Sequence, residues 1–483
     1  MSFWTPDQLQ RITAGRWLVK PADPQRPLQG LGLDSRAVRA GQVFLAIKGE
    51  RFDGHDFVDA ALAAGAGLAI VSRAGAERSC EAASGVLLVD DTLAALHVIA
   101  AAWRDRLAES DVKVIAVAGS NGKTTTRHLI HTVLSSKLRG TQSPKSFNNH
   151  IGVPLTLARM PCDVERAVFE IGMNAPGEIA PLSRMVQPHA ACVTTVGPVH
   201  IEGFADGETG VAHEKAAVFE GLGPGGAAVI NGDNDWAPLL RQAALRASAR
   251  VVSFGASADA DARLIDFTPN PDGARVEAEI FGRHYVFSLK QSGFHWGHNC
   301  LAVILMLDAL DVPVETALEA LSEFQPLAGR GQNKSVAIRG GSFLLIDESY
   351  NANPLSMRAG FLSLGARPVA AGGRRMVALT DMLELGDQSR ALHAGLAETI
   401  DAAGLDLVHT AGPQMKHLHD ALRPERRGLW RETAADLAEA LVEEVRPGDI
   451  VMVKGSNGSK ASAIAAALAD MERRRDAQEG AAS

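Results

Sequence analysis

A chain of 483 residues is longer than one hydrophobic core usually supports, and at roughly 150 residues per domain it predicts about three domains. With 46% hydrophobic and 22% charged residues, the composition is that of a globular protein and excludes a disordered, collagenous or coiled-coil chain. The formal net charge is −8, so no general positive field is available to hold nucleic acid or an anionic membrane. We therefore expect neither partner, and any phosphate must be bound locally.

The N-terminus lacks the basic and then apolar segments of a secretory signal, and no run approaches the roughly 18 apolar residues of a membrane span. A cytoplasmic protein is therefore expected. The cysteines Cys80, Cys162, Cys192 and Cys300 are far apart and form no C-x-x-C pair, so they indicate neither a zinc site nor a disulfide framework. We interpret them as buried thiols.

Residues 1–108 are predicted to form a small α/β domain, because short apolar runs alternate with helical patterns. The expected strands lie within residues 43–47, 67–72 and 85–91, and the expected helices within residues 55–66 and 93–107. The polar residues 108–111 indicate a domain boundary.

Residues 109–328 are predicted to form a doubly wound, largely parallel sheet, since apolar runs that end at turn residues alternate with helical stretches. Such runs lie within residues 112–119, 167–172, 191–197, 227–232 and 250–255, and the first helix is expected at residues 124–136. Residues 276–290 have the pattern of an appended antiparallel hairpin.

Residues 329–483 are predicted to form a second doubly wound, Rossmann-like domain. Its apolar runs lie within residues 343–347, 375–381, 407–412 and 449–455. The polar tail at residues 471–483 is expected to be frayed.

The most specific motif, Gly119-Ser120-Asn121-Gly122-Lys123-Thr124-Thr125-Thr126, lies where an expected strand gives way to a helix. Glycines let backbone N–H groups point into a concavity, the helix N-terminus favours anions, Lys123 can reach terminal phosphates and Thr124 can ligate Mg²⁺. Val117 stands where the standard phosphate-loop pattern has its first glycine. A glycine-rich turn with an incidental lysine is the alternative, but the strand-loop-helix context favours a site for a nucleoside triphosphate.

Three titratable residues follow this loop in the chain. Glu170 ends an apolar run, where a carboxylate could hold the Mg²⁺ that bridges nucleotide phosphates; a solvated strand end is the alternative. His200 follows another expected strand, and Lys215 falls early in a helical stretch. Because histidine is an uncommon magnesium ligand and a protonated lysine cannot be one, the residues alone favour a surface pair.

Polar side chains, most of them amides, occur together at two further places in the sequence. Asn148 and Asn149 precede Pro154, and a second group follows the expected strand at residues 343–347: Asp347, Tyr350, Asn351 and Asn353. Amides suit the recognition of peptide or base edges, but asparagine is also an ordinary turn residue. The Tyr350 ring could equally stack on a nucleobase or be packed with its hydroxyl satisfied.

The ordered motifs resemble those of the Mur ligase family over essentially the whole chain apart from the tail. They are GSNGKTTT, FNNHIGVPLTL, FEIGMNAPGEI, HIEGF, HEKAAVFEGL, GHN, IDESYNANP, TDMLELG and VMVKGS, together with DSRAVRAGQVFLAIKGERFDGHDF near the N-terminus. The resemblance implies an ATP-dependent ligase of peptidoglycan precursor synthesis in the bacterial cytoplasm. In it, ATP phosphorylates the terminal carboxylate of a UDP-N-acetylmuramoyl-tripeptide, and the amine of D-alanyl-D-alanine attacks the acyl phosphate.

The resemblance also implies roles for individual residues. Thr124 and Glu170 match ligands of a first Mg²⁺. Glu170, His200 and Lys215 match ligands of a second Mg²⁺, with the Lys215 amine converted to a carbamate by CO₂. Positions associated with ATP and domain closure are His298, Asn299, Arg330, Asp347 and Asn351. Ser35, Arg36, Lys48 and Gly49 match the UDP-substrate side, Asn148 and Asn149 the peptide side, and Lys454-Gly455-Ser456 a last-domain substrate loop for which an ordinary strand-to-helix turn is the alternative.

The first-ranked function is this ligation by a monomer, with Lys123, Glu170, His200 and Lys215 as the catalytic set. A sibling amide ligase, either one that adds a single diamino acid or one resembling folylpolyglutamate synthase, would share the central domain and hold other substrates. A nucleotide-gated binding protein would use the phosphate loop without forming an amide. Because phosphate-binding residues lie in the middle region and Asp347 in the last, catalysis is expected to need rotation about residues 327–332.

Overall fold

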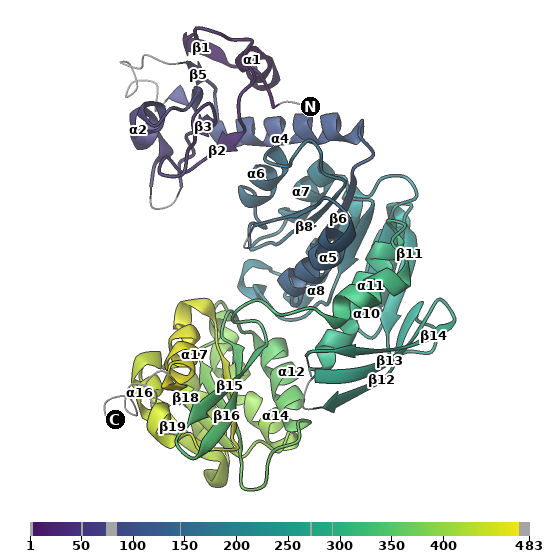
Figure 1. Ribbon diagram of the computed structural model, residues 1–483, viewed down its shortest axis with the longest axis vertical. Coiled ribbons are helices and arrows are strands. Elements are labelled where there is room, and N and C mark those ends of the chain that lie inside the picture. The colour runs from purple at the N-terminus through teal and green to yellow at the C-terminus, as the bar shows by residue number, and fades with distance from the viewer. Residues whose placement is uncertain are drawn as a thin grey trace.

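The computed structural model describes residues 3–49, 52–73, 85–144, 146–270, 273–291 and 293–472. Three sheets follow one another along the chain, each with its own helices (Figure 1). The parts of the chain built around them are called here the first, central and last domains. The predicted α/β fold class, with a mainly parallel central sheet and a Rossmann-like last domain, is confirmed.

The first domain has a five-stranded sheet in the order β1-β5-β4-β3-β2, in which only β1 is antiparallel to its neighbour. The strands are β1 (Arg16–Val19), β2 (Leu31–Gly32), β3 (Val43–Leu45), β4 (Leu68–Val71) and β5 (Val86–Leu88). The helices are α1 (Pro6–Thr13), η1 (Gly54–Phe57), α2 (Val58–Ala63) and α4 (Thr92–Ala108). All strands and helices predicted for this part of the chain are present.

Helix α4 joins the first domain to the central one, because its two faces pack on different domains (Figure 1). It contacts α1 on one side and α6 (Gly152–Ala158) and α7 (Ile179–Val186) on the other. Trp103 donates its indole N–H to the Met160 carbonyl at 2.9 Å, and Arg104 donates Nε–H to the Val186 carbonyl at 2.9 Å. The apolar core is therefore continuous across the two domains.

The central domain has a nine-stranded sheet in the order β14-β13-β12-β11-β10-β9-β6-β8-β7. The strands are β6 (Lys113–Ala118), β7 (Gly140–Gln142), β8 (Arg166–Glu170), β9 (Ala190–Val193), β10 (Ala227–Asn231), β11 (Arg250–Gly255), β12 (Ala262–Asn270), β13 (Gly273–Ile280) and β14 (Arg283–Leu289). Besides α6 and α7, the helices are α5 (Lys123–Lys137), η2 (Ile201–Gly203), α8 (Glu208–Ala216), η3 (Ala217–Gly221), α9 (Ala237–Arg246), α10 (Phe294–Asp308) and α11 (Val314–Ser322).

The predicted hairpin of the central sheet is β13–β14, and its two-residue turn explains the sharp reversal. Phe281 and Gly282 both have positive φ, of 50° and 75°, as the tightest hairpin turns require. The strand β12, which pairs antiparallel with β13, was not predicted. All other neighbours in this sheet are parallel. The carboxyl ends of β6, β8 and β9 therefore meet at one edge.

The last domain has a six-stranded sheet in the order β15-β16-β20-β17-β18-β19, antiparallel only between β15 and β16. The strands are β15 (Gln332–Ile338), β16 (Gly341–Glu348), β17 (Arg375–Thr380), β18 (Leu407–Ala411), β19 (Arg427–Arg431) and β20 (Ile450–Lys454). The helices are α12 (Pro354–Gly365), η4 (Gly386–Gln388), α13 (Ser389–Ala394), α14 (Leu396–Ala402), α15 (Met415–Ala421), η5 (Pro424–Arg426), α16 (Ala434–Glu444), η6 (Asn457–Ser459) and α17 (Ala461–Ala469). Separate apolar clusters cover the two faces of the sheet.

Some predictions concern single residues or the chain ends. Cys192 and Cys300 are fully buried, as predicted, whereas Cys162 is only partly buried. Cys80 and the tail from residue 473 lie outside the described residues. Among the described helices, none combines the length and the apolar character needed to cross a bilayer.

Candidate active site

The loop between β6 and α5 forms a concave phosphate site, and its glycines are required by the geometry. Gly119 has a φ of +142°, and a Cβ placed there would lie 2.0 Å from the Thr194 Oγ1. Gly122 has a φ of +80° and precedes the first turn of α5, where no side chain caps the free N–H groups. Lys123 extends back over the loop and donates from Nζ to the Gly119 carbonyl at 2.7 Å. The loop thus presents an ammonium group and helix-terminal amides to an anion.

Neighbouring strand ends hold this loop in place. Ser120 donates Oγ–H to the Gly197 carbonyl at 3.0 Å and accepts from the Gly197 N–H at 2.9 Å. The Thr194 hydroxyl donates to the Asn121 carbonyl. Residues that follow β9 therefore fix the shape of the loop, and the site does not depend on the loop sequence alone.

Glu170, at the end of β8, is 2% exposed, so the alternative of a solvated strand end is wrong. Its Oε2 accepts the Thr124 hydroxyl hydrogen bond at 2.7 Å, and its Oε1 accepts from the Asn148 amide at 2.8 Å. The structure brings together the two residues predicted as ligands of the first Mg²⁺. Asn148, predicted on the peptide side, lines the cavity and donates to this carboxylate.

Arg127 is a buried partner of Glu170 that the sequence analysis missed. Its Nε lies 3.4 Å from the Glu170 Oε2, and the side chain is 3% exposed. The same guanidinium donates to the Gln142 Oε1 and the Ser143 carbonyl. Arg127 follows Lys123 by four residues, so both lie on one face of α5, and that spacing could have revealed it.

Lys215, on α8, is 2% exposed, so the surface-pair interpretation is wrong for it. The Lys215 Nζ donates to the Met173 Sδ at 3.9 Å. The adjacent Glu214 carboxylate instead accepts from the Gly177 and Ile179 N–H groups at 2.7 Å each. Burial, aided by the nearby Lys123 ammonium, lowers the pKa of Lys215 well below its ordinary value.

His200 lines the same cavity but contacts another domain. Its Nδ1 lies 2.9 Å from the Oε2 of Glu384, which follows β17 in the last domain. Burial lowers the pKa of His200, while the Glu384 carboxylate opposes that shift. His200 is partly exposed at the cavity wall, and Glu384 was not among the predicted site residues.

His298 and Asn299, two of the predicted nucleotide-binding residues, also line the cavity. His298 lies beside the rings of Phe254 and Phe294, and its Nε2 lies 2.9 Å from the Asp233 Oδ2. Asn299 lies close to the phosphate loop, because a Cβ at Gly122 would be 3.1 Å from its Oδ1. An aromatic wall beside hydrogen-bonding groups suits a nucleobase.

Arg330 and Tyr350 also line the cavity and contact each other. The guanidinium carbon of Arg330 lies 3.8 Å from the centroid of the Tyr350 ring. The Tyr350 hydroxyl forms a hydrogen bond with the Ser146 Oγ at 2.7 Å. The ring is thus packed by Arg330 with its hydroxyl satisfied, which was one of the two alternatives for Tyr350.

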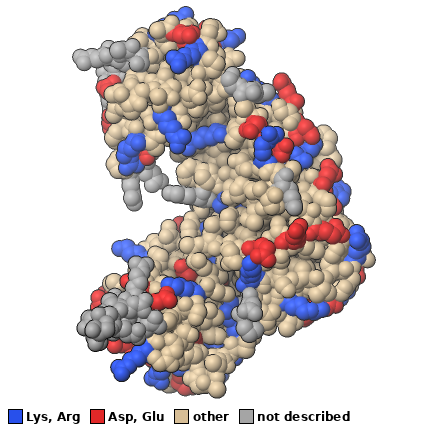
Figure 2. All heavy atoms as spheres, viewed as in Figure 1, with Lys and Arg blue, Asp and Glu red and all other residues tan. Residues whose placement is uncertain are grey.

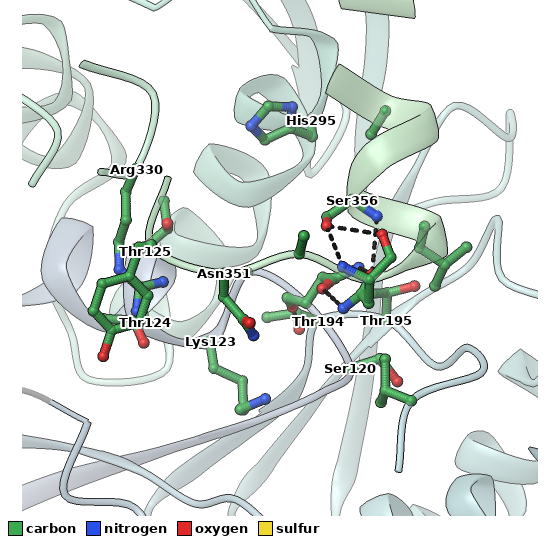
Figure 3. Close-up of a pocket in the computed structure, with 18 of the residues that line it drawn as sticks. Ser120, Lys123, Thr124, Thr125, Thr194, Thr195, His295, Arg330, Asn351 and Ser356 are labelled. Carbon is green, nitrogen blue, oxygen red and sulfur yellow. Dashed lines mark hydrogen bonds between the residues drawn. The ribbon is translucent and has the colours of Figure 1, made fainter. Parts of the chain in front are cut away.

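Last-domain residues form the opposite wall of the cavity. In Figure 3, Asn351 and Ser356 lie across from Lys123 and Thr124 of the phosphate loop. Lys454 donates from Nζ to the Glu348 Oε2 at 2.8 Å and to the Asn351 carbonyl at 3.3 Å. Asp347 does not line the cavity; its Oδ1 accepts from the Ser349 N–H at 3.0 Å.

The cavity has a volume of about 900 Å³ and is shared by the central and last domains. It brings together most of the predicted residues, which are Ser120, Asn121, Gly122, Lys123, Thr124, Thr125, Asn148, Asn149, Glu170, His200, Lys215, His298, Asn299, Arg330, Asn351, Lys454 and Ser456. Gly119 and Gly455 border it through their neighbours. The space is large enough for a nucleotide together with the end of a second substrate.

The residues predicted for the UDP-substrate side lie apart from this cavity, in the first domain. Arg36 is exposed and forms a two-point ion pair with Asp34, at 2.9 and 2.8 Å. The Gly49 N–H donates to the Phe52 carbonyl at 2.9 Å, and Lys48 pairs with Asp53 in a short β-bridge. Figure 2 shows the molecule hollowed between the first and last domains, so a long substrate could extend from one to the other.

Comparisons with known proteins agree with this geometry. The sequence matches the Mur ligase family catalytic domain at residues 27–104, the Mur ligase middle domain at 117–307 and the Mur ligase glutamate ligase domain at 329–457. It is 34% identical over 455 residues to the UDP-N-acetylmuramoyl-tripeptide–D-alanyl-D-alanine ligase of Bacillus subtilis (strain 168), covering 92% of this chain and 94% of that protein.

Two solved structures are similar over nearly the whole fold. A crystal structure of MurF from Acinetobacter baumannii superposes with a TM-score of 0.85 at 30% identity, covering 97% of this chain and 99% of that one. MurF ligase from Thermotoga maritima in complex with ADP superposes with a TM-score of 0.80 at 26% identity, covering 92% and 98%.

A phosphate loop on a parallel sheet, facing a Rossmann-like domain across a shared cavity, defines an ATP-dependent amide ligase. The chain belongs to the Mur ligase family.

Proposed function

We propose that the protein joins D-alanyl-D-alanine to UDP-N-acetylmuramoyl-tripeptide at the expense of ATP. The observation that carries the proposal is the buried Glu170 carboxylate, which lies beside the phosphate-loop Thr124 in a cavity shared with the last domain. Relatives that carry this activity in their names match the chain over more than nine tenths of its length.

The first chemical step would transfer the terminal phosphoryl group. A carboxylate oxygen of the tripeptide attacks the γ-phosphorus, the bond to the β,γ-bridging oxygen breaks, and ADP leaves. Lys123 and the N-terminal amides of α5 stabilise the negative charge that develops on the transferred group. Because several anions must meet in one place, these fixed positive groups reduce a repulsion that would otherwise keep the substrates apart.

The second step would form the amide. The amine nitrogen attacks the acyl carbon, phosphate leaves, and the amine loses a proton. Closure of the last domain over this cavity would exclude water, which would limit hydrolysis of the acyl phosphate and make the attack effectively intramolecular. Lys454 and Ser456, at the end of β20, line this cavity, which supports a role on the amine side.

The donor set fits magnesium held mainly by substrate phosphates. Among the described residues, no cluster of three or more His, Cys, Asp or Glu side chains forms a protein-only metal site. Magnesium often keeps water and phosphate ligands and takes only one or two protein carboxylates, and Thr124 with Glu170 meets that demand. Bound there, the ion would neutralise charge on the phosphates.

Lys215 fits a carbamate. Its buried amine has no carboxylate among its described hydrogen-bond partners, while Lys123 lies close enough to repel its charge. An amine that is neutral part of the time can add CO₂, and the resulting anion would complement nearby cations. We propose that modified Lys215, His200 and Glu170 hold a second magnesium ion.

The remaining assignments complete the proposal. Ser35, Arg36, Lys48 and Gly49 would bind the uridine nucleotide, and Asn148 and Asn149 the peptide. Domain boundaries at 108/109 and 328/329, a monomeric state and a location in the bacterial cytoplasm are part of the same proposal.

Formation of ADP by the purified protein with UDP-tripeptide tests the function. We expect ADP formation to depend on D-alanyl-D-alanine and to yield the pentapeptide in equal amount. Dependence on a single diamino acid would instead establish a sibling ligase. ATP hydrolysis without a covalent product would establish a nucleotide-gated binding protein.

A further inference from the structure

The contact between His200 and Glu384 joins two domains at the edge of the proposed magnesium site. His200 follows β9 in the central domain, and Glu384 lies between β17 and η4 in the last domain. The His200 Nδ1 lies 2.9 Å from the Glu384 Oε2. This ion-pair contact therefore exists only when the last domain lies against the central one.

The backbone on both sides of the contact is unusual. His200 and Glu384 both have positive φ, of 54° and 62°, a backbone conformation that residues other than glycine rarely adopt. Left-handed backbone at a non-glycine residue persists where surrounding contacts impose it, and it concentrates at functional sites. Two such residues meeting side chain to side chain make an incidental surface contact a poor explanation.

The segment that carries Glu384 is anchored at the end of β20. The Leu383 N–H donates to the Ser456 Oγ at 3.0 Å, and the Ser456 N–H donates to the Asp381 carbonyl at 3.2 Å. On the other side, a Cβ at Gly386 would be 3.4 Å from Glu202, so the segment sits closely on η2 of the central domain. Glu384 thus connects the proposed amine side with the residue predicted to support the second cation.

We propose that Glu384 is a positioning residue: by accepting a hydrogen bond from the His200 Nδ1–H, it holds the imidazole in the tautomer whose Nε2 lone pair is available to the active site. A histidine that donates one ring N–H to a carboxylate is fixed in both orientation and tautomer. The second cation site is then completed only when the last domain docks. This inference rests on the proposed function, because it assigns Glu384 a role at that same site.

The test compares three variants of the full-length protein. Glu384→Ala removes the acceptor, Glu384→Gln keeps an oxygen acceptor without the charge, and Asp387→Ala removes an exposed carboxylate from the same segment as a matched control. The first readout is the ¹⁵N spectrum of histidine-labelled protein, with the His200 signals assigned by their loss in His200→Gln. The second is the Mg²⁺ concentration that gives half-maximal ligation.

We expect Nδ1 of His200 to be the protonated nitrogen in the wild type, in Glu384→Gln and in Asp387→Ala, and the two tautomers to be mixed in Glu384→Ala. The half-maximal Mg²⁺ concentration should rise about 10- to 100-fold in Glu384→Ala, with a smaller change in Glu384→Gln and none in Asp387→Ala. An Nε2-protonated wild type, or a Glu384→Ala protein unchanged in both readouts, overturns the inference. The tautomer is measured without substrates, so a failed ligation assay leaves that readout decisive.

Discussion

Asn121 of the phosphate loop and Asn353 at the start of α12 exchange two amide hydrogen bonds, of 3.0 Å and 2.5 Å, across the boundary between the central and last domains. Asn353 also caps α12, since its Oδ1 accepts from the Ser356 N–H at 2.9 Å. One side chain therefore both stabilises a helix and attaches that helix to the loop that would hold ATP.

Substitution at Asn353 should separate these two roles. Asn353→Ala removes both and should lower the free energy of unfolding by about 0.5 to 2 kcal/mol through the lost cap alone. Asn353→Ser retains a capping oxygen and loses only the amide pair, so it should be nearly as stable as the wild type yet show weaker attachment of the last domain. Urea unfolding measures the stability, and small-angle scattering with an ATP analogue measures the docking. Equal stability of the Ala and Ser variants would contradict the capping role.

Lys123→Ala should abolish most ligation, because the transferring phosphoryl group loses its ammonium partner. A loss of about 100- to 1,000-fold in kcat is expected for removal of one such electrostatic contact. Binding of a uridine nucleotide, measured by calorimetry, should be nearly unchanged since that site lies in the first domain. Turnover close to that of the wild type would remove Lys123 from the mechanism.

Lys215→Ala should be inactive and partly recover with added short carboxylates, which would replace the missing anion. In the wild type, ¹³C-labelled CO₂ should give a carbamate signal that is absent from the variant. Lys215→Arg is the matched control, because it keeps a cation that cannot form a carbamate and should not recover. If the wild type shows no carbamate signal and Lys215→Ala does not recover, Lys215 is an unmodified buried amine.

Arg127→Met should destabilise the protein by about 3 to 5 kcal/mol, the usual cost of removing one partner from a buried ion pair. Arg127→Lys keeps the charge but cannot reproduce the separate contacts to Gln142 and Ser143. It should therefore fall between the wild type and the Met variant in chemical unfolding. Wild-type stability in the Met variant would show that Glu170 needs no guanidinium.

Acidification should weaken the last domain through His409. The residue is fully buried, and burial lowers its pKa from 6.5 to about 4, so the unfolded chain takes up a proton that the folded chain resists. Its contribution is complete above pH 6.5 and is lost as the pH falls towards 4, amounting to about 2 kcal/mol between pH 7 and 5. His409→Asn should lose correspondingly less over that interval in thermal unfolding. A parallel pH dependence in both proteins would exclude His409.

The sequence predicted the strand-loop-helix at residues 112–136 because each local signal there agrees: an apolar strand, conformationally demanding glycines and a helical apolar face. It also placed Glu170 correctly at a strand end. It did not predict β12, whose alternation is interrupted where the register shifts between Leu264 and Asp266. Short runs with such an irregularity lose the period of two that marks a strand.

The contacts that could not be predicted join residues distant in the chain. Glu384 and His200, or Tyr350 and Ser146, meet only because separate domains dock, and no local pattern encodes that docking. Lys215 was misjudged for a related reason: its burial depends on Met173 and the packing around α8, not on its own neighbours in sequence. Asp347 matched a family position yet turns away from the cavity, towards its own loop.

Helix α4 has a further consequence. Because it is packed on both sides, the span between the first domain and the phosphate loop is preset, whereas the last domain is the part expected to rotate. A substrate bound by its nucleotide end would then place its reactive carboxylate at one fixed distance from the first domain. Such an enzyme would select peptides by length and would reject those one residue shorter or longer, whatever their side chains.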